Sequence, residues 1–258
     1  MSAGTWNPDQ YERFRDERSQ PFFDLLALVA ARPGMRAVDL GCGTGELTRT
    51  LHQRLGAAET LGLDSAPTML QRAAPRAGDG LTFAPGDLAA FAPERPYDLV
   101  FSNAALQWLP DHPALLRRLT AAVAPDGGQL AFQVPANVDH PSHVTAAEVA
   151  AEEPFAAALG GHVRPLTILP PEDYARLLHG LGYRRQHVRL QVYTHLLADR
   201  AQVIEWVRGT FLTDYQRRLP PDLFATFLDR YRARLLPRLA DEQPYLFPFN
   251  RILAWAQR

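Results

Sequence analysis

The sequence predicts an α/β fold built on a parallel sheet with crossover helices. Short β-type runs alternate with helical patterns from Met35 to Val134, an order typical of parallel strands joined by helices. A run of alternating glycines stands where the first strand is expected to end and the first helix to begin. The chain has 258 residues, 47% of them hydrophobic and 21% charged. It is therefore long enough to bury a sizeable core around one sheet.

Five strands are expected in the first part of the chain, at residues 36–40, 60–64, 81–84, 97–103 and 129–134. Leucines recur at four-residue spacing from Leu47 to Leu55 and a glycine follows, so a helix with one buried stripe is expected between the first two strands. Ser65 is expected to cap the next helix, and Asp111 the helix that begins near residue 113.

Helical patterns dominate after Val134, at about 142–160, 171–181, 199–211 and 221–240. Two β-rich runs, around 188–192 and 246–255, would extend the first sheet to seven strands. Because no Gly/Ser-rich linker separates a second domain, we expect one domain over residues 1–258. It would carry a lid near residues 1–22 and a helical cap from residues 135–180 and 197–242.

Composition and charge exclude several classes of function. The formal net charge is −1 and all 27 basic residues are arginines, so neither nucleic acid nor an anionic membrane surface is expected as a partner. The single cysteine, Cys42, cannot form an intrachain disulfide, and the first ten residues have no apolar core of a signal peptide. The apolar run Leu25–Ala31 is too short to span a bilayer, which needs about 20 apolar residues. A cytoplasmic protein is expected.

The strongest local motif is the run Val38–Glu46, which reads Val-Asp-Leu-Gly-Cys-Gly-Thr-Gly-Glu. Alternating glycines let a ligand approach the backbone closely, and Asp64 ends the next expected strand, where an acid can bind ribose hydroxyls. A nucleoside ligand is therefore indicated. A dinucleotide fingerprint would need glycine in place of Glu46, and Asp39 would repel a pyrophosphate. The acidic rim instead suits a ligand with cationic groups, such as S-adenosylmethionine.

With these residues the chain resembles the class I, Rossmann-like methyltransferases, whose first motif is similar to this Asp-x-Gly-x-Gly-x-Gly. The resemblance implies a seven-stranded sheet and the cofactor S-adenosylmethionine. It also implies that the glycine loop lies against the methionine part of the cofactor, that Asp64 binds ribose and that Asp87 lies near adenine. The full set of cofactor residues so implied is Asp39, Gly41, Gly43, Gly45, Asp64, Ser65, Asp87, Leu88 and Asn103. Cys42 is interpreted as a small filler beside the loop, not a nucleophile.

The residues after the fourth strand narrow the chemical class of the methyl acceptor. Enzymes that methylate exocyclic amines usually carry Pro-Pro-aromatic there, whereas this chain has Ser-Asn-Ala-Ala at 102–105. The stretches 6–26, 102–112, 205–210 and 246–251 resemble one subfamily, the trans-aconitate 2-methyltransferases. That resemblance implies a small polycarboxylate substrate and a carboxyl O-methylation.

Carboxylate methylation is chemically consistent with the candidate residues. A carboxylate is ionised at pH 7 and needs no general base, whereas arginine forks hold carboxylates with paired hydrogen bonds. Trp108 follows the fourth strand, at the edge where ligands bind in open α/β folds, and its indole N–H could donate to the acceptor. We expect Trp108 and Arg18 to act in catalysis. The expected substrate-binding residues are Tyr11, Arg18, Gln107, Trp108, Arg208 and Arg251.

Three alternatives remain open from the sequence. One is an O-methyltransferase that acts on a free or carrier-bound malonyl group, another is a cofactor-binding module without catalysis, and a nicotinamide-dependent oxidoreductase ranks last. No metal is expected, because His140 and His143 lack a carboxylate or cysteine at ligand-like spacing. A monomer or a weak homodimer is expected.

Overall fold

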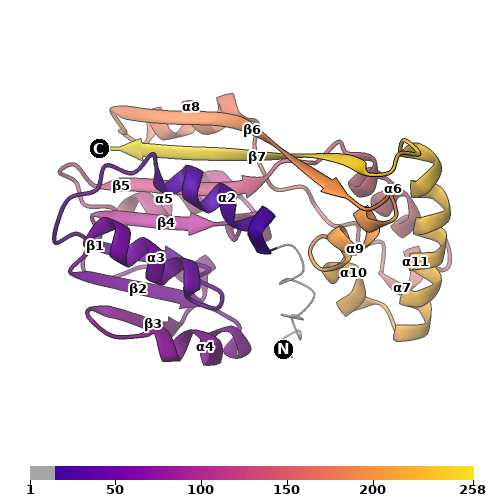
Figure 1. Ribbon diagram of the computed structural model, residues 1–258, viewed down its shortest axis with the longest axis horizontal. Coiled ribbons are helices and arrows are strands. Elements are labelled where there is room, and N and C mark those ends of the chain that lie inside the picture. Colours follow the sequence, from indigo (N-terminus) through magenta and orange to yellow (C-terminus); the bar gives the residue numbers. More distant parts are fainter. Residues whose placement is uncertain (1–14) are drawn as a thin grey trace. The chain divides into compact units, whose positions relative to one another are not determined.

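The computed structural model describes residues 15–258, with side chains from Ser19 onward. The described chain forms two compact units. The sheet unit comprises Asp16–Ala136, Thr167–Gln191 and Arg251–Arg258, and the helical unit comprises Asn137–Leu166 and Val192–Asn250. Figure 1 shows the elements of both units along the chain.

The expected seven-stranded sheet is confirmed, with the strand order β3-β2-β1-β4-β5-β7-β6. Its strands are β1 (Arg36–Leu40), β2 (Glu59–Asp64), β3 (Leu81–Pro85), β4 (Leu99–Asn103), β5 (Gln129–Pro135), β6 (Arg185–Leu197) and β7 (Tyr245–Gln257). The first five strands are parallel, and β7 runs antiparallel to β5. Only the first part of β6 and the last part of β7 belong to the sheet unit.

The register determines which residues meet at the carboxyl edge of the parallel strands. Asn103 at the end of β4 pairs with Gln133 of β5. Because β7 is antiparallel, its entry into the sheet unit lies at this same edge, where Arg251 pairs with Pro135. Ligands bind outside the carboxyl ends of the strands in open α/β sheets, so this edge is where a site is expected.

Helices cover both faces of the sheet. The helices of the sheet unit are α2 (Arg15–Leu26), α3 (Glu46–Leu55), α4 (Pro67–Ala73), α5 (His112–Ala121) and α8 (Pro171–Gly180). Leu115 of α5 and Tyr174 of α8 share a buried cluster with Val100 of β4. Phe22 of α2 contacts Phe101, the residue that follows Val100 in β4, and the two ring centroids lie 5.4 Å apart. Since neighbouring residues of a strand point to opposite faces, α2 lies on the other side of the sheet (Figure 1).

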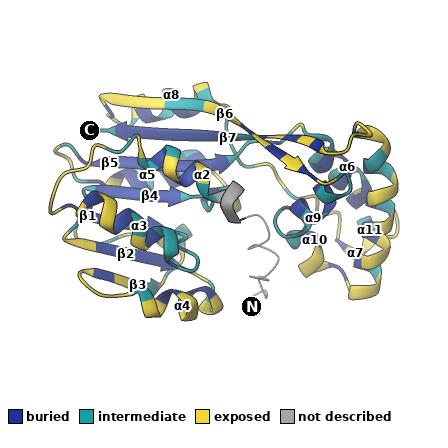
Figure 2. Ribbon diagram, viewed as in Figure 1, coloured by how far each residue is buried: buried dark blue, intermediate teal, exposed yellow. Residues whose placement is uncertain are grey.

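Burial follows from the position of each strand in the sheet. The strands β1, β4 and β5 are almost entirely buried, whereas β3 is only partly buried and the start of β6 is largely exposed. Figure 2 shows this change from the middle of the sheet to its two outer strands. The central strands read as apolar runs for this reason.

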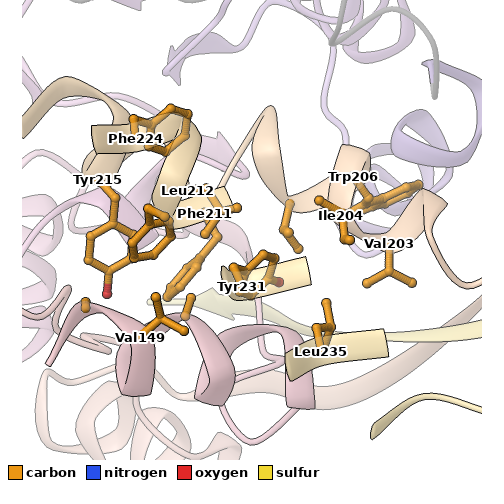
Figure 3. Packing of buried hydrophobic residues seen from close by; sticks show 14 of the residues in the cluster. Val149, Val203, Ile204, Trp206, Phe211, Leu212, Tyr215, Phe224, Tyr231 and Leu235 are labelled. Carbon is orange, nitrogen blue, oxygen red and sulfur yellow. The ribbon is translucent and has the colours of Figure 1, made fainter. Parts of the chain in front are cut away.

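The helical unit has a core of its own. Its helices are α6 (Pro141–Ala150), α7 (Phe155–Ala158), α9 (Gln202–Arg208), α10 (Thr213–Arg218) and α11 (Pro221–Leu235). Val149, Phe211, Tyr215 and Tyr231 belong to one buried cluster, and Figure 3 shows these side chains gathered between the helices. The Tyr231 hydroxyl donates to the backbone carbonyl of Ser142, 2.9 Å away, so its polar atom is satisfied inside this core.

Two expected helix caps have different outcomes. Asp111 caps α5 as predicted, since its Oδ1 accepts from the backbone N–H of Ala114 at 3.0 Å. The prediction that Ser65 caps the next helix is wrong, because α4 starts after Ala66 and has no side-chain cap. Asp64 instead accepts from the N–H of Ala66 at 2.8 Å.

The later helices are shorter than the sequence pattern indicates. The run 142–160 divides into α6 and α7 at Pro154, and 199–211 ends as α9 at Gly209. Proline lacks an N–H for the helix interior, and glycine is a poor helix former. The helix α8, which the sequence groups with the cap, packs on the sheet because Tyr174 and Leu178 are buried against its core. The division into one domain with a lid and a cap otherwise stays a prediction.

Candidate functional site

The glycine loop joins β1 to α3 at the carboxyl edge. Gly41, Gly43 and Gly45 all have positive φ, at 81°, 56° and 73°, a region that favours glycine. A Cβ at Gly41 would lie 2.3 Å from Cβ of Ala105, so the loop packs directly against the turn after β4. A Cβ at Gly43 would meet no described atom within 4 Å. Gly43 therefore leaves one side of the loop open to a ligand.

Asp39 lies beneath this loop and is 4% exposed. Its Oδ2 accepts from the Thr48 hydroxyl at 2.6 Å, whereas its Oδ1 has no hydrogen-bond partner among the described residues. Burial raises the pKa of Asp39 to about 7, and the nearby charge of Asp64 adds to the rise. A buried carboxyl group with an open acceptor atom suits a cationic donor, which would restore its charged form.

Asp64 holds the glycine loop against the end of β2. Its Oδ2 accepts from the N–H of Gly43 at 2.9 Å, and its Oδ1 accepts from Ala66. Each carboxylate oxygen can accept a second hydrogen bond, so Asp64 can still bind ribose hydroxyls. The neighbouring Ser65 is exposed.

The third acid, Asp87, follows β3 and is exposed. Its Oδ1 accepts from the N–H of Ala89 at 2.8 Å and so starts the short helix η2 (Leu88–Ala90). Leu88 comes within 3.9 Å of the position that a Cβ on Gly41 would take. The ends of β1, β2 and β3 thus converge on one loop.

The turn after β4 packs against the glycine loop and carries side chains that are expected to bind the methyl acceptor. Asn103 ends the strand, and Ala104 has a φ of 55°, which is uncommon for a residue other than glycine. The short helix η3 (Leu106–Trp108) follows. Trp108 is 36% exposed, so the indole is partly accessible at this edge.

Gln107 is held by its own turn. Its Nε2 donates to the carbonyl of Ala104 at 2.7 Å, which fixes the amide orientation. Its Oε1 is buried without a hydrogen-bond partner in the described part of the chain. This oxygen is an acceptor, so direct binding of a carboxylate falls to the remaining N–H of the amide.

Arg251 stands at the start of the β7 segment in the sheet unit and is 4% exposed. Its Nη1 donates to Oε1 of Gln133 at 3.2 Å. The amide is neutral, so this bond directs the guanidinium without neutralising its charge. Burying a cation is costly, and an arginine kept at the ligand edge is consistent with binding an anion.

The structure does not test the three remaining arginine and tyrosine candidates. Arg208 belongs to α9 in the helical unit, with its Nη1 3.9 Å from Oε2 of Glu205. Arg18 lies in α2, but its side chain is outside the described residues. Tyr11, with the first part of the expected lid, also lies outside them. Their roles stay predictions.

Cys42 is unsuited to nucleophilic catalysis. Burial, together with the charges of Asp39 and Asp64, raises the pKa of its thiol far above its ordinary value. The thiolate is the reactive form of cysteine, so the interpretation of Cys42 as a packing residue agrees with the structure.

Sequence reasoning missed the residues that hold the candidate side chains in place. His112 Nε2 lies 3.1 Å from the carbonyl of Leu106, and its Nδ1 is hydrogen-bonded to the Tyr174 hydroxyl, so this pair anchors η3. Burial lowers the pKa of His112, which keeps it neutral. Gln133 was missed as well, although a polar residue inside the apolar run of β5 is a signal that the sequence contains.

The charged groups follow the strand order along the edge. Acids stand after β3, at the end of β2 and within β1: these are Asp87, Asp64 and Asp39. Neutral amides follow on β4 and β5, and Arg251 stands on β7. The edge therefore changes from acidic to neutral to basic over neighbouring strands. The acidic side of the edge suits a cationic nucleoside and the basic side suits an anion. The turn that follows Asn103 lies between them.

These residues fit S-adenosylmethionine. The open acceptor on Asp39 suits its ammonium group, Gly43 leaves space beside the loop, and Asp64 retains acceptor capacity for hydroxyls. Among the side chains of residues 19–258, no group of three or more His, Cys, Asp or Glu is arranged to hold a metal ion. None of the described helices is both long and apolar enough to cross a membrane.

The fold resembles that of known methyltransferases. The YcgJ protein of Bacillus subtilis superimposes with a TM-score of 0.60 at 14% identity, over 93% of this chain and 98% of that one. A phosphoethanolamine N-methyltransferase 2 of Haemonchus contortus, solved with S-adenosylhomocysteine, gives a TM-score of 0.55 at 17% identity, over 93% of this chain and 53% of that one. At these identities the likeness concerns the fold alone.

Sequence comparison identifies the family. A family model described as a methyltransferase domain matches residues 11–188. A trans-aconitate 2-methyltransferase of Deinococcus radiodurans is 46% identical over 98% of both chains. The enzyme of the same name from Methylobacterium nodulans is 43% identical over 98% of both. The malonyl, non-catalytic and nicotinamide alternatives gain no support from these relatives. The chain therefore belongs to the trans-aconitate 2-methyltransferase family, whose members are S-adenosylmethionine-dependent enzymes.

Proposed function

We propose that this chain transfers the methyl group of S-adenosylmethionine to one carboxylate of trans-aconitate, or of a similar small polycarboxylate, and releases the monomethyl ester. The observation that carries the proposal is the order of charges along the carboxyl edge, from Asp87 through Asn103 to Arg251. The family membership agrees with it.

The reaction needs little acid–base chemistry. S-Adenosylmethionine supplies an electrophilic methyl group on a cationic sulfur. A carboxylate oxygen forms the new O–CH3 bond as the S–CH3 bond breaks, the bonding electrons stay on sulfur, and no proton moves. Carboxylic acids have pKa values near 4, so the acceptor is ionised at pH 7. The chain must mainly align the two reactants and exclude water.

Each residue at the edge then has a distinct task. Asp39 binds the ammonium group and Asp64 the ribose hydroxyls, while Asp87 and Leu88 lie toward the adenine. Arg251 binds a carboxylate that is not methylated, because a full guanidinium charge on the reacting oxygen would reduce its nucleophilicity. Trp108 donates its weaker, neutral N–H to the reacting carboxylate.

Three further residues complete the proposed substrate site. Arg18 and Arg208 bind further carboxylates of the substrate, and Tyr11 closes over the site within a lid at residues 1–22. The segments at 135–166 and 197–242 form a cap, without α8, whose residues belong to the sheet unit. The chain acts in the cytoplasm as a monomer or a weak homodimer, without nucleic acid or a membrane as partner. The near-neutral charge and the absence of lysine support the exclusion of nucleic acid and of a membrane as partners.

A radiolabel assay tests the proposal. The purified chain is given methyl-labelled S-adenosylmethionine with trans-aconitate, cis-aconitate, citrate, malonate or a malonyl carrier protein, and the label in extractable ester is counted. We expect the highest kcat/KM with trans-aconitate. Label in none of the acids, with normal calorimetric binding of S-adenosylhomocysteine, would refute catalysis and leave a binding module.

A pair of arginine variants sharpens this test. Arg251→Met should raise the KM for trans-aconitate by about 10- to 100-fold, the range for loss of a hydrogen bond to a charged group. Arg185→Met is the matched control, because Arg185 is an exposed arginine at the start of β6. An equal effect of both substitutions would remove Arg251 from the substrate site.

A further inference from the structure

Gln133 is a fully buried amide in the middle of the apolar strand β5. It stands opposite Asn103 in the register of the sheet. Buried polar groups are costly unless hydrogen-bonded, so the contacts of this side chain show why the strand tolerates it.

The Gln133 amide connects two candidate site residues. Its Nε2 donates to Oδ1 of Asn103 at 3.0 Å, and its Oε1 accepts from Nη1 of Arg251 at 3.2 Å. The side chain therefore joins the end of β4 to the start of the β7 segment, across β5. All three residues belong to the sheet unit.

These two bonds leave only one orientation for the amides. A guanidinium can only donate, so the atom of Gln133 that faces Arg251 must be the oxygen. The atom that faces Asn103 is then the nitrogen, and the atom of Asn103 that it meets must be an acceptor. The Nδ2 group of Asn103, with its two N–H donors, is consequently turned away from Gln133.

The backbone of Gln133 also holds the turn that follows β4. Its carbonyl accepts from the N–H of Ala104 at 3.0 Å, and Ala104 has positive φ. The next residue, Ala105, packs against the glycine loop. Gln133 is thus tied to the turn that lies between the acidic and basic parts of the edge.

We propose that Gln133 is a positioning residue for methyl transfer, which presents the N–H donors of Asn103 and the charge of Arg251 to an anionic acceptor. A neutral amide suits this task. It directs Arg251 without itself neutralising the guanidinium, whereas a carboxylate there would neutralise the arginine and repel the acceptor. The inference rests on the proposed function and specifies how the same site recognises its acid.

Two isosteric substitutions separate positioning from packing. Gln133→Glu keeps an acceptor for Arg251 but loses the donor to Asn103 and adds negative charge. Gln133→Met removes both bonds with little change in volume. The matched control is Gln129→Met, because Gln129 is equally buried at the other end of β5 and its Oε1 accepts from the Trp255 indole at 2.8 Å.

The readouts are kcat, the KM for trans-aconitate, the Kd for S-adenosylhomocysteine and the Tm. Each Gln133 variant should lower kcat/KM for trans-aconitate by about 10- to 100-fold, with the Kd changed less than threefold. Gln129→Met should lower the Tm and leave kcat/KM within threefold of the parent.

The pH profile gives a readout that a packing role would not move. The carboxyl group that Gln133→Glu introduces is neutral when protonated and then regains a donor. The activity of this variant relative to the parent should therefore rise as the pH falls through the pKa of the introduced carboxyl group, which the neighbouring Arg251 lowers. The same ratio for Gln133→Met should stay constant, because methionine does not titrate.

Each outcome decides a separate point. If the parent is active and both Gln133 variants keep their kcat/KM within threefold, or lose it only in proportion to a weaker Kd and a lower Tm, the inference is wrong. A ratio for Gln133→Glu that falls as the pH is lowered also contradicts it. A parent that methylates no acid overturns the proposed function, and this inference with it.

Discussion

The substitution Asp39→Asn separates the stability of the ligand-free chain from its affinity for cofactor. The pKa of Asp39 is raised from 3.8 to about 7 by burial and by Asp64. At 1.36 kcal/mol for each pKa unit, ionising Asp39 costs about 4 kcal/mol more in the folded chain than in the unfolded chain. This is an order-of-magnitude figure for a side chain that is 4% exposed.

The direction of the pH effect follows from proton counting. Between about pH 4 and pH 7 the folded chain holds a proton on Asp39 that the unfolded chain has lost. The free energy of unfolding therefore falls as pH rises through this window, and the full cost is present above pH 7. Asparagine has no charge to bury, although its unpaired amide costs about 1–3 kcal/mol. The variant should be more stable than the parent at pH 8, by about 1–3 kcal/mol, and no more stable at pH 5.

Urea unfolding at pH 5 and pH 8 measures this difference, and calorimetry measures the binding of S-adenosylhomocysteine. The variant should bind at least tenfold more weakly at pH 8, because the charged partner of the ammonium group is gone. Asp98→Asn is the control: Asp98 also carries a charge beside the sheet, but it accepts from the N–H of Arg36 at 2.8 Å and pairs with Arg32. This control should lose stability and keep its affinity. A variant at Asp39 that is destabilised equally at both pH values, or that binds as tightly as the parent, would refute the reasoning.

Three further predictions concern the loop and the helical unit. Gly41→Ala should weaken cofactor binding by more than tenfold in calorimetry, because its Cβ would lie 2.3 Å from Cβ of Ala105; unchanged binding would show that the loop yields without cost. Cys42→Ala should keep kcat within threefold, and the parent thiol should resist a disulfide reagent until the chain unfolds, since its pKa is raised by burial; rapid labelling of the folded chain would contradict this. Arg208→Ala should raise the KM for trans-aconitate far more than the Kd for S-adenosylhomocysteine, and equal changes in both would exclude Arg208 from the substrate site.

Much of the fold could be predicted because hydrophobic periodicity follows directly from burial. The strand at 36–40 matches β1 in full, and the two late runs become β6 and β7. The same periodicity does not report what a helix packs against, so the pattern at 171–181 predicts part of the cap although Tyr174 buries its ring in the sheet unit. Helix starts are also harder to predict, since α4 begins after Ala66 without a side-chain cap, although Ser65 is expected to cap it.

The meeting of the glycine loop with acids at one edge of the sheet was predictable, since glycines and acids at strand ends are visible in the local sequence. The relation of Gln133 to Asn103 and Arg251 was not, because it depends on sheet register and spans 118 positions of the chain. The buried state of Arg251 could not be derived from spacing either. From the sequence, an arginine in a β-rich run can equally be a surface residue or a site residue. The antiparallel pairing with β5 is what places Arg251 at the ligand edge.

A crystal structure of the chain soaked with S-adenosylhomocysteine and trans-aconitate tests the central claim most directly. The account predicts the ammonium group beside Asp39, the ribose on Asp64, and a carboxylate of the acid within hydrogen-bond distance of the Arg251 guanidinium. A nucleoside bound away from the glycine loop, or an acid bound on the Asp87 side of the edge, would contradict it.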